Sequence, residues 1–187
     1  MTQIFDNFLP QGYADQIEED LNRTQFPWHY ISDVTNRNYG SNSGFVHMAV
    51  DFGSQPTEWF PFIKPIVYSI EEAMQYRIAK LLRIRVGLLM QTHQDNYSYN
   101  TPHVDFLFPH HTACYYVNNT DGDTVVFNET TKGINPLTDD TVQDYVKNTE
   151  FTIETRSEPR KNRLCVFDGL QFHSSTKPKQ HEKRLVI

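Results

Sequence analysis

The sequence predicts an α+β, mainly β fold: an antiparallel sandwich or roll with N-terminal helices packed on one face. Two stretches in the first half repeat apolar residues with the period of a helix. Six short stretches in the second half are rich in β-branched and aromatic residues and are separated by turn residues. The 187 residues, 38% hydrophobic and 13% aromatic, suffice for one sizeable core, so we expect a single domain, 1–187.

The chain begins with a short apolar run and a helical pattern. Residues 3–10 (QIFDNFLP) end in proline and suit an edge strand or a lead-in turn. Residues 11–23 place Tyr13, Ile17 and Leu21 four residues apart, which predicts an amphipathic helix with these side chains on one face.

The next elements are a loop, a strand and a second helix. Residues 35–44 (TNRNYGSNSG) are polar and rich in turn formers, and residues 45–52 alternate as in a strand. We expect the second helix at 65–82, with Pro61 and Pro65 near its start, where a missing N–H costs little. Its apolar residues recur at steps of three and four: Val67, Ile70, Met74 and Ile78.

Strand-like stretches fill the rest of the chain. They are residues 84–93, 111–118, 123–128, 150–156, 162–169 and 183–187. The long connection at 129–162 contains TDDTVQDYVKN, a candidate short helix, and long connections of this kind are commonly lids over a site.

Charge and hydropathy exclude several classes. The net charge is −6, and the densest basic runs, EPRKNR and HEKR, are short and interrupted by acid, so nucleic acid is a disfavoured partner. No apolar run reaches the ~18 residues of a membrane span, and the N-terminus lacks the pattern of a signal peptide. We therefore expect a soluble, cytoplasmic protein that contacts no membrane. The sequence does not specify its oligomeric state.

Two cysteines are too few for a disulfide framework or a zinc knuckle. Cys114 and Cys165 both lie in apolar, strand-like runs, where we expect buried, inert thiols.

The stretch TPHVDFLFPHH carries the first chemical signal. His103 and Asp105 are two residues apart, so on a strand they project to the same face. An imidazole and a carboxylate form two corners of a metal site, and His173, seventy residues downstream, is the candidate third ligand. Two histidines and one carboxylate on one face of an octahedral ion leave three positions open, as in non-haem Fe(II) oxygenases. Taken alone, a His-x-Asp pair is more often incidental.

Arg184 is the informative addition, because it lies inside the apolar stretch KRLVI. A buried guanidinium needs a carboxylate partner, ideally a bidentate one. Two partners fit: an Asp or Glu of the protein, or the distal carboxylate of a bound diacid.

Together these motifs resemble the 2-oxoglutarate- and Fe(II)-dependent dioxygenases, and within them the prolyl-4-hydroxylase-like branch. The resemblance rests on HVD, FDGLQFHSS and Arg184, and also on YYVNNTDGDTVVFNE, EPRKNRLCVFDGLQFHSS and the opening IFDNFLPQGYADQIEEDL. It extends from about residue 4 to residue 187.

The resemblance implies a double-stranded β-helix (jelly roll) whose metal lies near the open mouth. It implies that His103, Asp105 and His173 hold Fe(II) and that Arg184 pairs with the far carboxylate of 2-oxoglutarate. O2 would be the second co-substrate, and the resemblance also admits ascorbate as a cofactor. The reaction would be an oxidative decarboxylation coupled to hydroxylation of a small molecule, a free amino acid or a prolyl or other peptidyl residue.

The sequence departs from this family at two points. Many relatives carry Lys where this chain has Arg184, and Lys183 stands directly before it. Neighbours on a strand face opposite sides, so only one of the two points inward, and we choose Arg184. A tyrosine about ten residues before the first ligand often provides a further 2-oxoglutarate contact. Here that role is divided among four candidates: Tyr97, Tyr99, His93 and Gln91.

The other histidines have structural interpretations. We expect His110 and His111 at a turn or strand rim, His181 in a solvated loop and His47 partly exposed on a strand. The alternative function is a non-catalytic metal-binding jelly roll that binds or senses a ligand.

Overall fold

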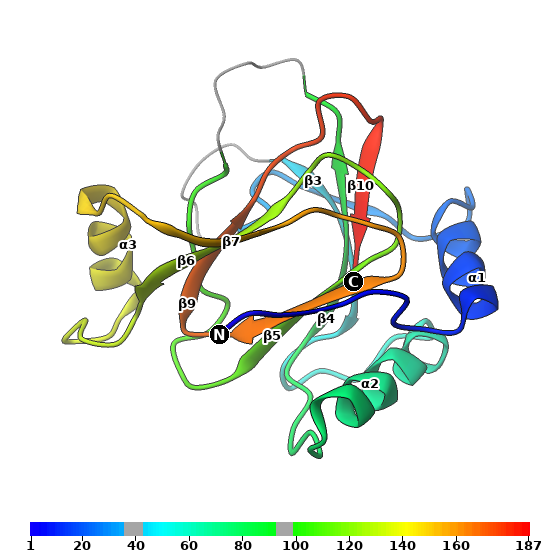
Figure 1. Cartoon of the computed structure of the whole chain (residues 1–187), viewed down its shortest axis with the longest axis horizontal. Coiled ribbons are helices and arrows are strands. Elements are labelled where there is room, and N and C mark those ends of the chain that lie inside the picture. Colours follow the sequence, from blue (N-terminus) through cyan, green and yellow to red (C-terminus); the bar gives the residue numbers. More distant parts are fainter. Residues whose placement is uncertain (36–42, 93–98) are drawn as a thin grey trace.

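The computed structural model describes residues 1–35, 43–92 and 99–187. Within these ranges the chain forms helices α1 to α3 and strands β1 to β10 (Figure 1). The helices are α1 (Gln11–Leu21), α2 (Phe60–Met74) and α3 (Asp139–Asn148). The strands are β1 (Gln3–Phe5), β2 (His29–Ile31), β3 (Gly44–Val50), β4 (Ile84–Met90), β5 (His111–Tyr116), β6 (Thr124–Thr130), β7 (Ile153–Ser157), β8 (Arg163–Asp168), β9 (Gln171–Ser175) and β10 (Lys183–Val186).

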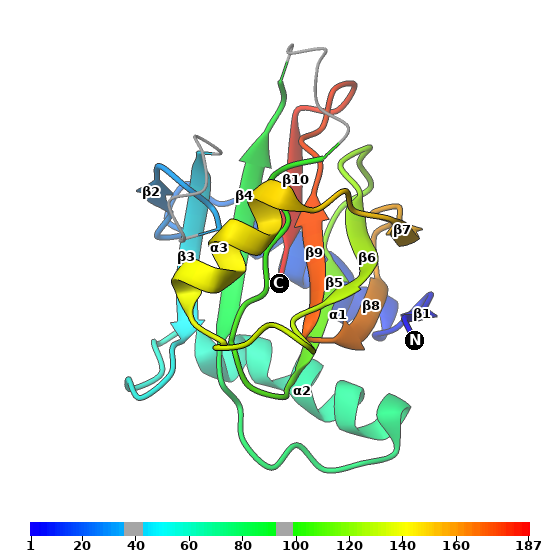
Figure 2. The same cartoon turned by 90° about the vertical axis from the view of Figure 1, so that its left-hand side faces the viewer.

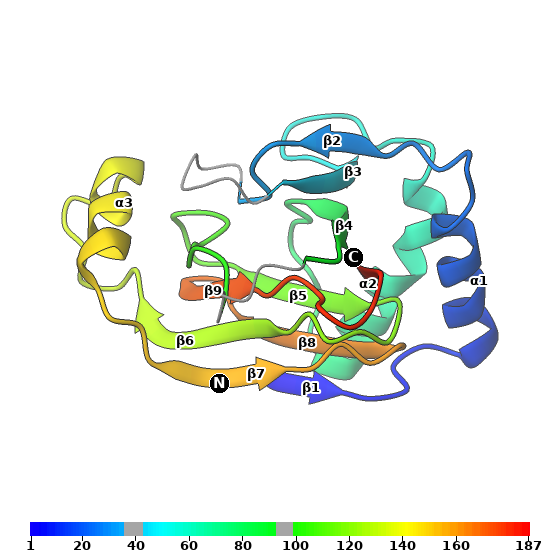
Figure 3. The same ribbon diagram turned by 90° about the horizontal axis from the view of Figure 1, so that it is seen from above.

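The strands form two antiparallel sheets. The large sheet has the order β1-β8-β5-β10-β4-β3-β2, and the small sheet has the order β7-β6-β9. Strands β1 and β2 lie at opposite edges of the large sheet (Figures 2 and 3). The mainly β fold with helices outside the sheets is confirmed.

Alternation along the strands divides the side chains among three apolar clusters. The largest cluster joins α1 and α2 to the outer face of the large sheet, through residues such as Ile17, Ile63 and Leu164. A second cluster fills the space between the two sheets. The large sheet contributes Tyr116, Cys165 and Phe167 to it, and the small sheet contributes Val126. The third joins α3 to the outer face of the small sheet.

Helix α2 begins five residues earlier than expected and ends at Met74. Pro61 occupies the first turn, but Pro65 lies inside the helix, so the expectation that both prolines mark the start was wrong for Pro65. The helix ends because Gln75 adopts a left-handed conformation, with φ of 57°. Ile78, expected on the helix, instead donates its N–H to the Glu71 side chain at 2.8 Å.

Two further expectations need correction. Residues 101–105 do not form a regular strand: His103 makes an isolated bridge to His173, and the rest of the segment is extended or bent. Residues 171–175, which were not predicted as a strand, form β9. The short helix predicted within 129–162 is confirmed as α3.

Asp121 holds the loop that leads into β10. Its carboxylate accepts hydrogen bonds from the backbone N–H groups of Lys179 and Gln180, at 2.9 and 3.0 Å, and from the His181 ring at 3.0 Å. Burial opposes ionisation, but these donors outweigh it and lower the pKa of Asp121 to about 2. The loop, and with it the start of β10, is therefore tied to the turn after β5.

We predict that Asp121→Asn lowers the free energy of unfolding at pH 7 by about 1–2 kcal/mol. Because the folded-state pKa lies below the ordinary value, this stabilisation is complete above about pH 4. It is lost as pH falls through about 2. Urea unfolding should therefore give a lower free energy of unfolding for the variant than for the original protein at pH 7. This gap in free energy should narrow at pH 3. Asp144→Asn, on a 75% exposed side chain, is the matched control and should show no gap. A gap that stays constant with pH would contradict this assignment.

Candidate metal centre

His103 and His173 are brought together by backbone hydrogen bonds. The N–H of each residue donates to the carbonyl oxygen of the other, both at 2.9 Å, and the ring centroids lie 4.5 Å apart. His173 is on β9 and His103 is on the extended segment between β4 and β5. Two residues separated by seventy positions are thereby fixed as neighbours.

Local sequence explains why both rings face the space between the sheets. On β9, His173 opposes Val126 of the interior cluster, and Phe172 points the other way into the cluster under α3. Val104, between the first two candidate ligands, also points into the cluster under α3 and is 1% exposed. Alternation then turns His103 and Asp105 inward.

The ligand atoms of His103, Asp105 and His173 all lie within 4.8 Å of one another. The Nε2 atom of His173 is 3.6 Å from the Asp105 carboxylate. In both histidines Nδ1 lies near a backbone carbonyl two residues earlier, that of Thr101 at 3.3 Å and that of Gln171 at 3.4 Å. These contacts favour a proton on Nδ1 and leave the Nε2 lone pair for a metal.

The protonation states also suit a metal site. Burial, helped by the charge of His173, lowers the pKa of His103 to about 3. Burial likewise lowers the pKa of His173, so both rings are neutral at pH 7 and able to bind metal. For Asp105, burial alone would raise the pKa, but the electrostatic effect of His173 and of the Arg83 guanidinium, among others, outweighs it and holds the pKa below its ordinary value. Two neutral imidazoles and a carboxylate fit a divalent transition metal such as iron.

Arg83, which was not predicted as a site residue, forms an ion pair with Asp105. The guanidinium pairs with one carboxylate oxygen, and the other oxygen faces His173 and lies 3.5 Å from the Thr112 hydroxyl. One oxygen is thus held by Arg83, and the other lies beside His173 and Thr112.

Arg184 points inward from β10, as chosen, and is 5% exposed. Its Nη2 donates to the Thr124 hydroxyl at 2.8 Å and lies 4.0 Å from Cys114 Sγ, and its Nε has no partner. Lys183 points the other way and bonds Asn22 after α1. One of the two expected partners of Arg184 was an Asp or Glu of the protein. In the described residues, Arg184 makes no hydrogen bond to a carboxylate. An unpaired Nε on a buried guanidinium is a position for an anion.

The structure does not bring Tyr99 or Gln91 to this cluster. Tyr99 packs edge-on against Phe127, 4.9 Å between centroids, in the cluster under α3. Gln91 is exposed and donates to the Lys179 carbonyl at 2.6 Å. His93 and Tyr97 lie outside the described residues.

The other histidines have structural surroundings. The ring of His110 packs against Gly169, where a Cβ would overlap it, and His111 stacks on Tyr76 at the rim. His181 pairs with Asp121. His47, expected to be partly exposed, is buried at 5% and lies 3.1 Å from the Thr57 hydroxyl, because α2 and its lead-in cover that face of β3. Cys165 is a buried free thiol as expected, whereas Cys114 is only half-buried.

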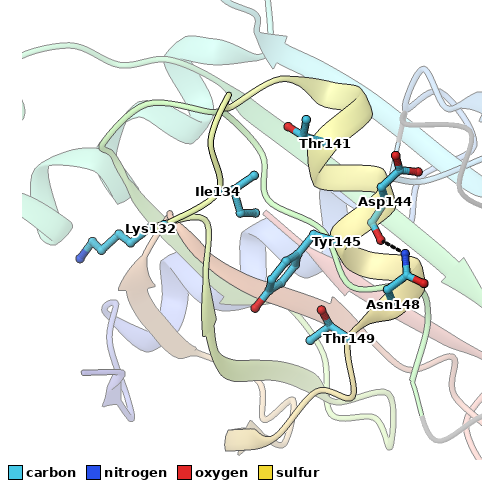
Figure 4. Close-up of a pocket in the computed structure, with 8 residues that line it drawn as sticks. Lys132, Ile134, Thr141, Asp144, Tyr145, Asn148 and Thr149 are labelled. Carbon is cyan, nitrogen blue, oxygen red and sulfur yellow. Dashed lines mark hydrogen bonds between the residues drawn. The ribbon is translucent and has the colours of Figure 1, made fainter.

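Helix α3 is packed by its apolar face, through Val142 and Tyr145, onto the outer side of the small sheet. Figure 1 shows it at the end of the molecule opposite α1. A pocket of about 590 Å³ lies beside it, lined by Lys132, Ile134, Tyr145 and neighbouring residues (Figure 4). None of the metal-cluster residues lines this pocket.

Two facing antiparallel sheets with a His-x-Asp…His cluster between them define a class. This is the jelly-roll, double-stranded β-helix fold of the 2-oxoglutarate/Fe(II) oxygenases. Three solved structures of that class match 99% of this chain. The α-ketoglutarate-dependent epimerase SnoN from nogalamycin biosynthesis matches with a TM-score of 0.62 at 14% identity over 74% of its own chain. A Pseudomonas putida prolyl-4-hydroxylase matches with 0.58 at 12% identity over 89% of its chain. A Trichoplax adhaerens prolyl hydroxylase, in complex with a hypoxia-inducible-factor peptide, matches with 0.60 at 14% identity over 80%.

The predicted resemblance is therefore confirmed for the fold. No protein-family model and no curated protein sequence matches the chain. None of the helices in the described ranges is long and apolar enough to cross a membrane.

Proposed function

We propose that the protein is a non-haem Fe(II) oxygenase that couples oxidative decarboxylation of 2-oxoglutarate to oxidation of a second substrate, typically by hydroxylation. The observation that carries the proposal is the convergence of His103, Asp105 and His173 between the sheets, with the unpaired guanidinium Nε of Arg184 beyond them. The SnoN complex with Fe³⁺ and α-ketoglutarate gives a precedent on the same fold.

In this proposal the chain supplies the ligands and their orientation. Nε2 of each histidine and the Asp105 oxygen that faces His173 would hold Fe(II), and Arg83 would keep the other oxygen engaged. Bound iron would supply the redox chemistry that O2 and the keto acid require. Burial of both imidazoles limits the access of water to the cluster.

The co-substrate would lie between the cluster and Arg184. On the inner face of β5, Thr112 lies beside Asp105, and Cys114, two residues on, lies beside Arg184. Two residues of a strand span about 6.8 Å, comparable to the length of a five-carbon diacid. Arg184 would then bind the distal carboxylate through its fork of donors. The substrate would be a small molecule, a free amino acid or a peptidyl residue, with ascorbate as an optional reductant.

The test uses anaerobically purified protein supplied with Fe(II), 2-oxoglutarate and then O2. We expect succinate to form slowly without a substrate and faster with one, and we expect omission of Fe(II) to abolish it. Before O2 is added, the visible absorption of an iron-bound keto acid should appear. Metal binding without keto-acid binding or succinate formation, across a panel of peptides and free amino acids, would overturn the proposal. It would favour a metal-binding jelly roll that only binds or senses a ligand.

A further inference from the structure

Arg85 is a further cation on the inner wall of the site, besides Arg83 and Arg184. It lies two residues after Arg83 on β4 and shares a face with Leu89, the residue that opposes Arg184 in register. Burial lowers the pKa of Arg85, the charge of Asp105 raises it, and the charges of Arg83 and Arg184 lower it further. A guanidinium stays charged in proteins, so this site holds a permanent positive charge.

The hydrogen bonding of Arg85 does not neutralise that charge. Its Nη1 donates to the backbone carbonyl of Val34 at 2.8 Å. A carbonyl oxygen satisfies one of five donors and contributes no full negative charge. The residue is largely buried, and this one hydrogen bond leaves other guanidinium donors for a ligand. Burying a cation without a counter-ion is costly, so an anion is expected there.

The neighbouring charges point the same way. Among the described residues, Arg83, Arg85 and Arg184 point to the inner side of the large sheet with Asp105, and Asp123, a carboxylate near Arg184, pairs with Arg156 at 3.6 Å. A divalent ion and a dianionic keto acid would cancel each other and add no counter-ion for Arg85. Cations gathered in a cleft of an acidic protein favour an anionic ligand.

Arg85 and Arg184 are directed to opposite sides of the site. Arg184 bonds Thr124 of β6, and Arg85 bonds Val34 in the segment after β2, and Figures 2 and 3 show β2 and β6 on opposite sides of β4. The Val34 side chain lies so close to β3 that a Cβ on Gly44 would be 2.8 Å from it. This segment therefore lies beside the start of β3 and the end of β4, and the Arg85 side chain, which starts opposite Met48, extends along the sheet to reach it. A keto acid held by Arg184 would leave Arg85 free.

We propose that Arg85 binds the carboxylate of the second substrate, and that this substrate is a small organic acid such as a free α-amino acid. The inference rests on the proposed oxygenase function and narrows its substrate to anions. An internal residue of a peptide chain has no free α-carboxylate, so a guanidinium that binds this group selects a free acid.

The first experiment uses protein reconstituted with Mn(II) and 2-oxoglutarate, and measures binding by calorimetry without turnover. The probes are the twenty proteinogenic L-amino acids and their carboxamides. We expect at least one acid to bind 10-fold or more tightly than its amide, and Arg85→Gln to remove that preference while 2-oxoglutarate binding stays unchanged. Arg85→Lys should restore part of it. Arg77→Gln, on a 90% exposed side chain, is the matched control.

Three results would overturn the inference while leaving the proposed function intact. One is keto-acid binding with no acid preferred over its amide. Another is a peptide bound more tightly than every free acid. The third is a rise in the 2-oxoglutarate requirement of Arg85→Gln, which would assign the residue to the co-substrate. Failure of metal and keto-acid binding in the unmodified protein would instead overturn the proposed function itself.

A second measurement needs no ligand. An arginine whose role is to bind a negatively charged substrate contributes little to the free energy of unfolding. Arg85→Met should therefore unfold at a urea midpoint equal to or above that of the original protein. Arg163 is a buried arginine paired with Asp6, and Arg163→Met should lower the midpoint. An equal loss in both variants would make Arg85 a structural residue.

Discussion

Replacing Asp105 with alanine is expected to reduce succinate formation by on the order of 100-fold or more. Loss of a residue that only orients a metal ligand already costs about 10–100-fold, and Asp105 is proposed as the ligand itself. Its removal also leaves Arg83 without its ion-pair partner beside two neutral imidazoles, so the site would repel a divalent cation. Both effects lower metal affinity, which titration with Fe(II) or Mn(II) measures directly.

Two further variants make this prediction specific. Asp105→Asn keeps the shape of the side chain and should also lose metal affinity, and circular dichroism should show that it is folded. Asp144→Ala removes an exposed carboxylate from α3 and should keep full turnover. If Asp105→Asn were folded and kept both metal affinity and turnover, the assignment of this carboxylate as a ligand would be wrong.

Arg184→Ala is expected to raise the 2-oxoglutarate concentration needed for half-maximal turnover by about 10- to 100-fold. A hydrogen bond to a charged partner contributes about 1.5–3 kcal/mol, and about 1.4 kcal/mol corresponds to a factor of ten. Arg184 does not touch His103, Asp105 or His173 through any hydrogen bond in the described residues, so metal affinity should be retained. The two readouts are a saturation curve in 2-oxoglutarate and a metal titration.

The neighbouring residue supplies the control. Lys183→Ala removes a cation one position away whose side chain points outward to Asn22, and it should leave the 2-oxoglutarate requirement unchanged. Arg184→Lys keeps the charge but loses the planar fork, so an intermediate requirement is expected. An unchanged requirement in Arg184→Ala would remove this residue from the co-substrate site.

Periodicity predicted the elements whose signal is local. Helix α1, helix α3 and most strands follow from the spacing of apolar residues and from turn formers. The start of α2 did not follow, because Pro65 was taken as a start signal and instead lies inside the helix, where proline normally costs a backbone hydrogen bond. Strand β9 was missed because QFHSS is polar at four of its five positions, and its burial comes from pairing with β6 rather than from composition.

The candidate site was predicted in part, for a physical reason. His103, Asp105, His173 and Arg184 are polar residues in apolar surroundings, and such residues are visible in a sequence. Arg83 and Arg85 carry the same signal, since they alternate with Ile84 and Val86 in LRIRVG, and the argument used for Arg184 applies to them equally. Of the four candidates for the further co-substrate contact, Tyr99 turns toward α3 and Gln91 bonds the Lys179 carbonyl, while His93 and Tyr97 lie outside the described residues and stay predictions.

The reciprocal hydrogen bonds between His103 and His173 give the centre a mechanical property. Because each main chain clamps the other, the two imidazoles are held in place before any ion arrives. Loading the metal therefore demands little rearrangement, and emptying the centre should leave its shape nearly intact. A change in the backbone at either His103 or His173 would also displace the other residue, so both metal ligands would be lost together.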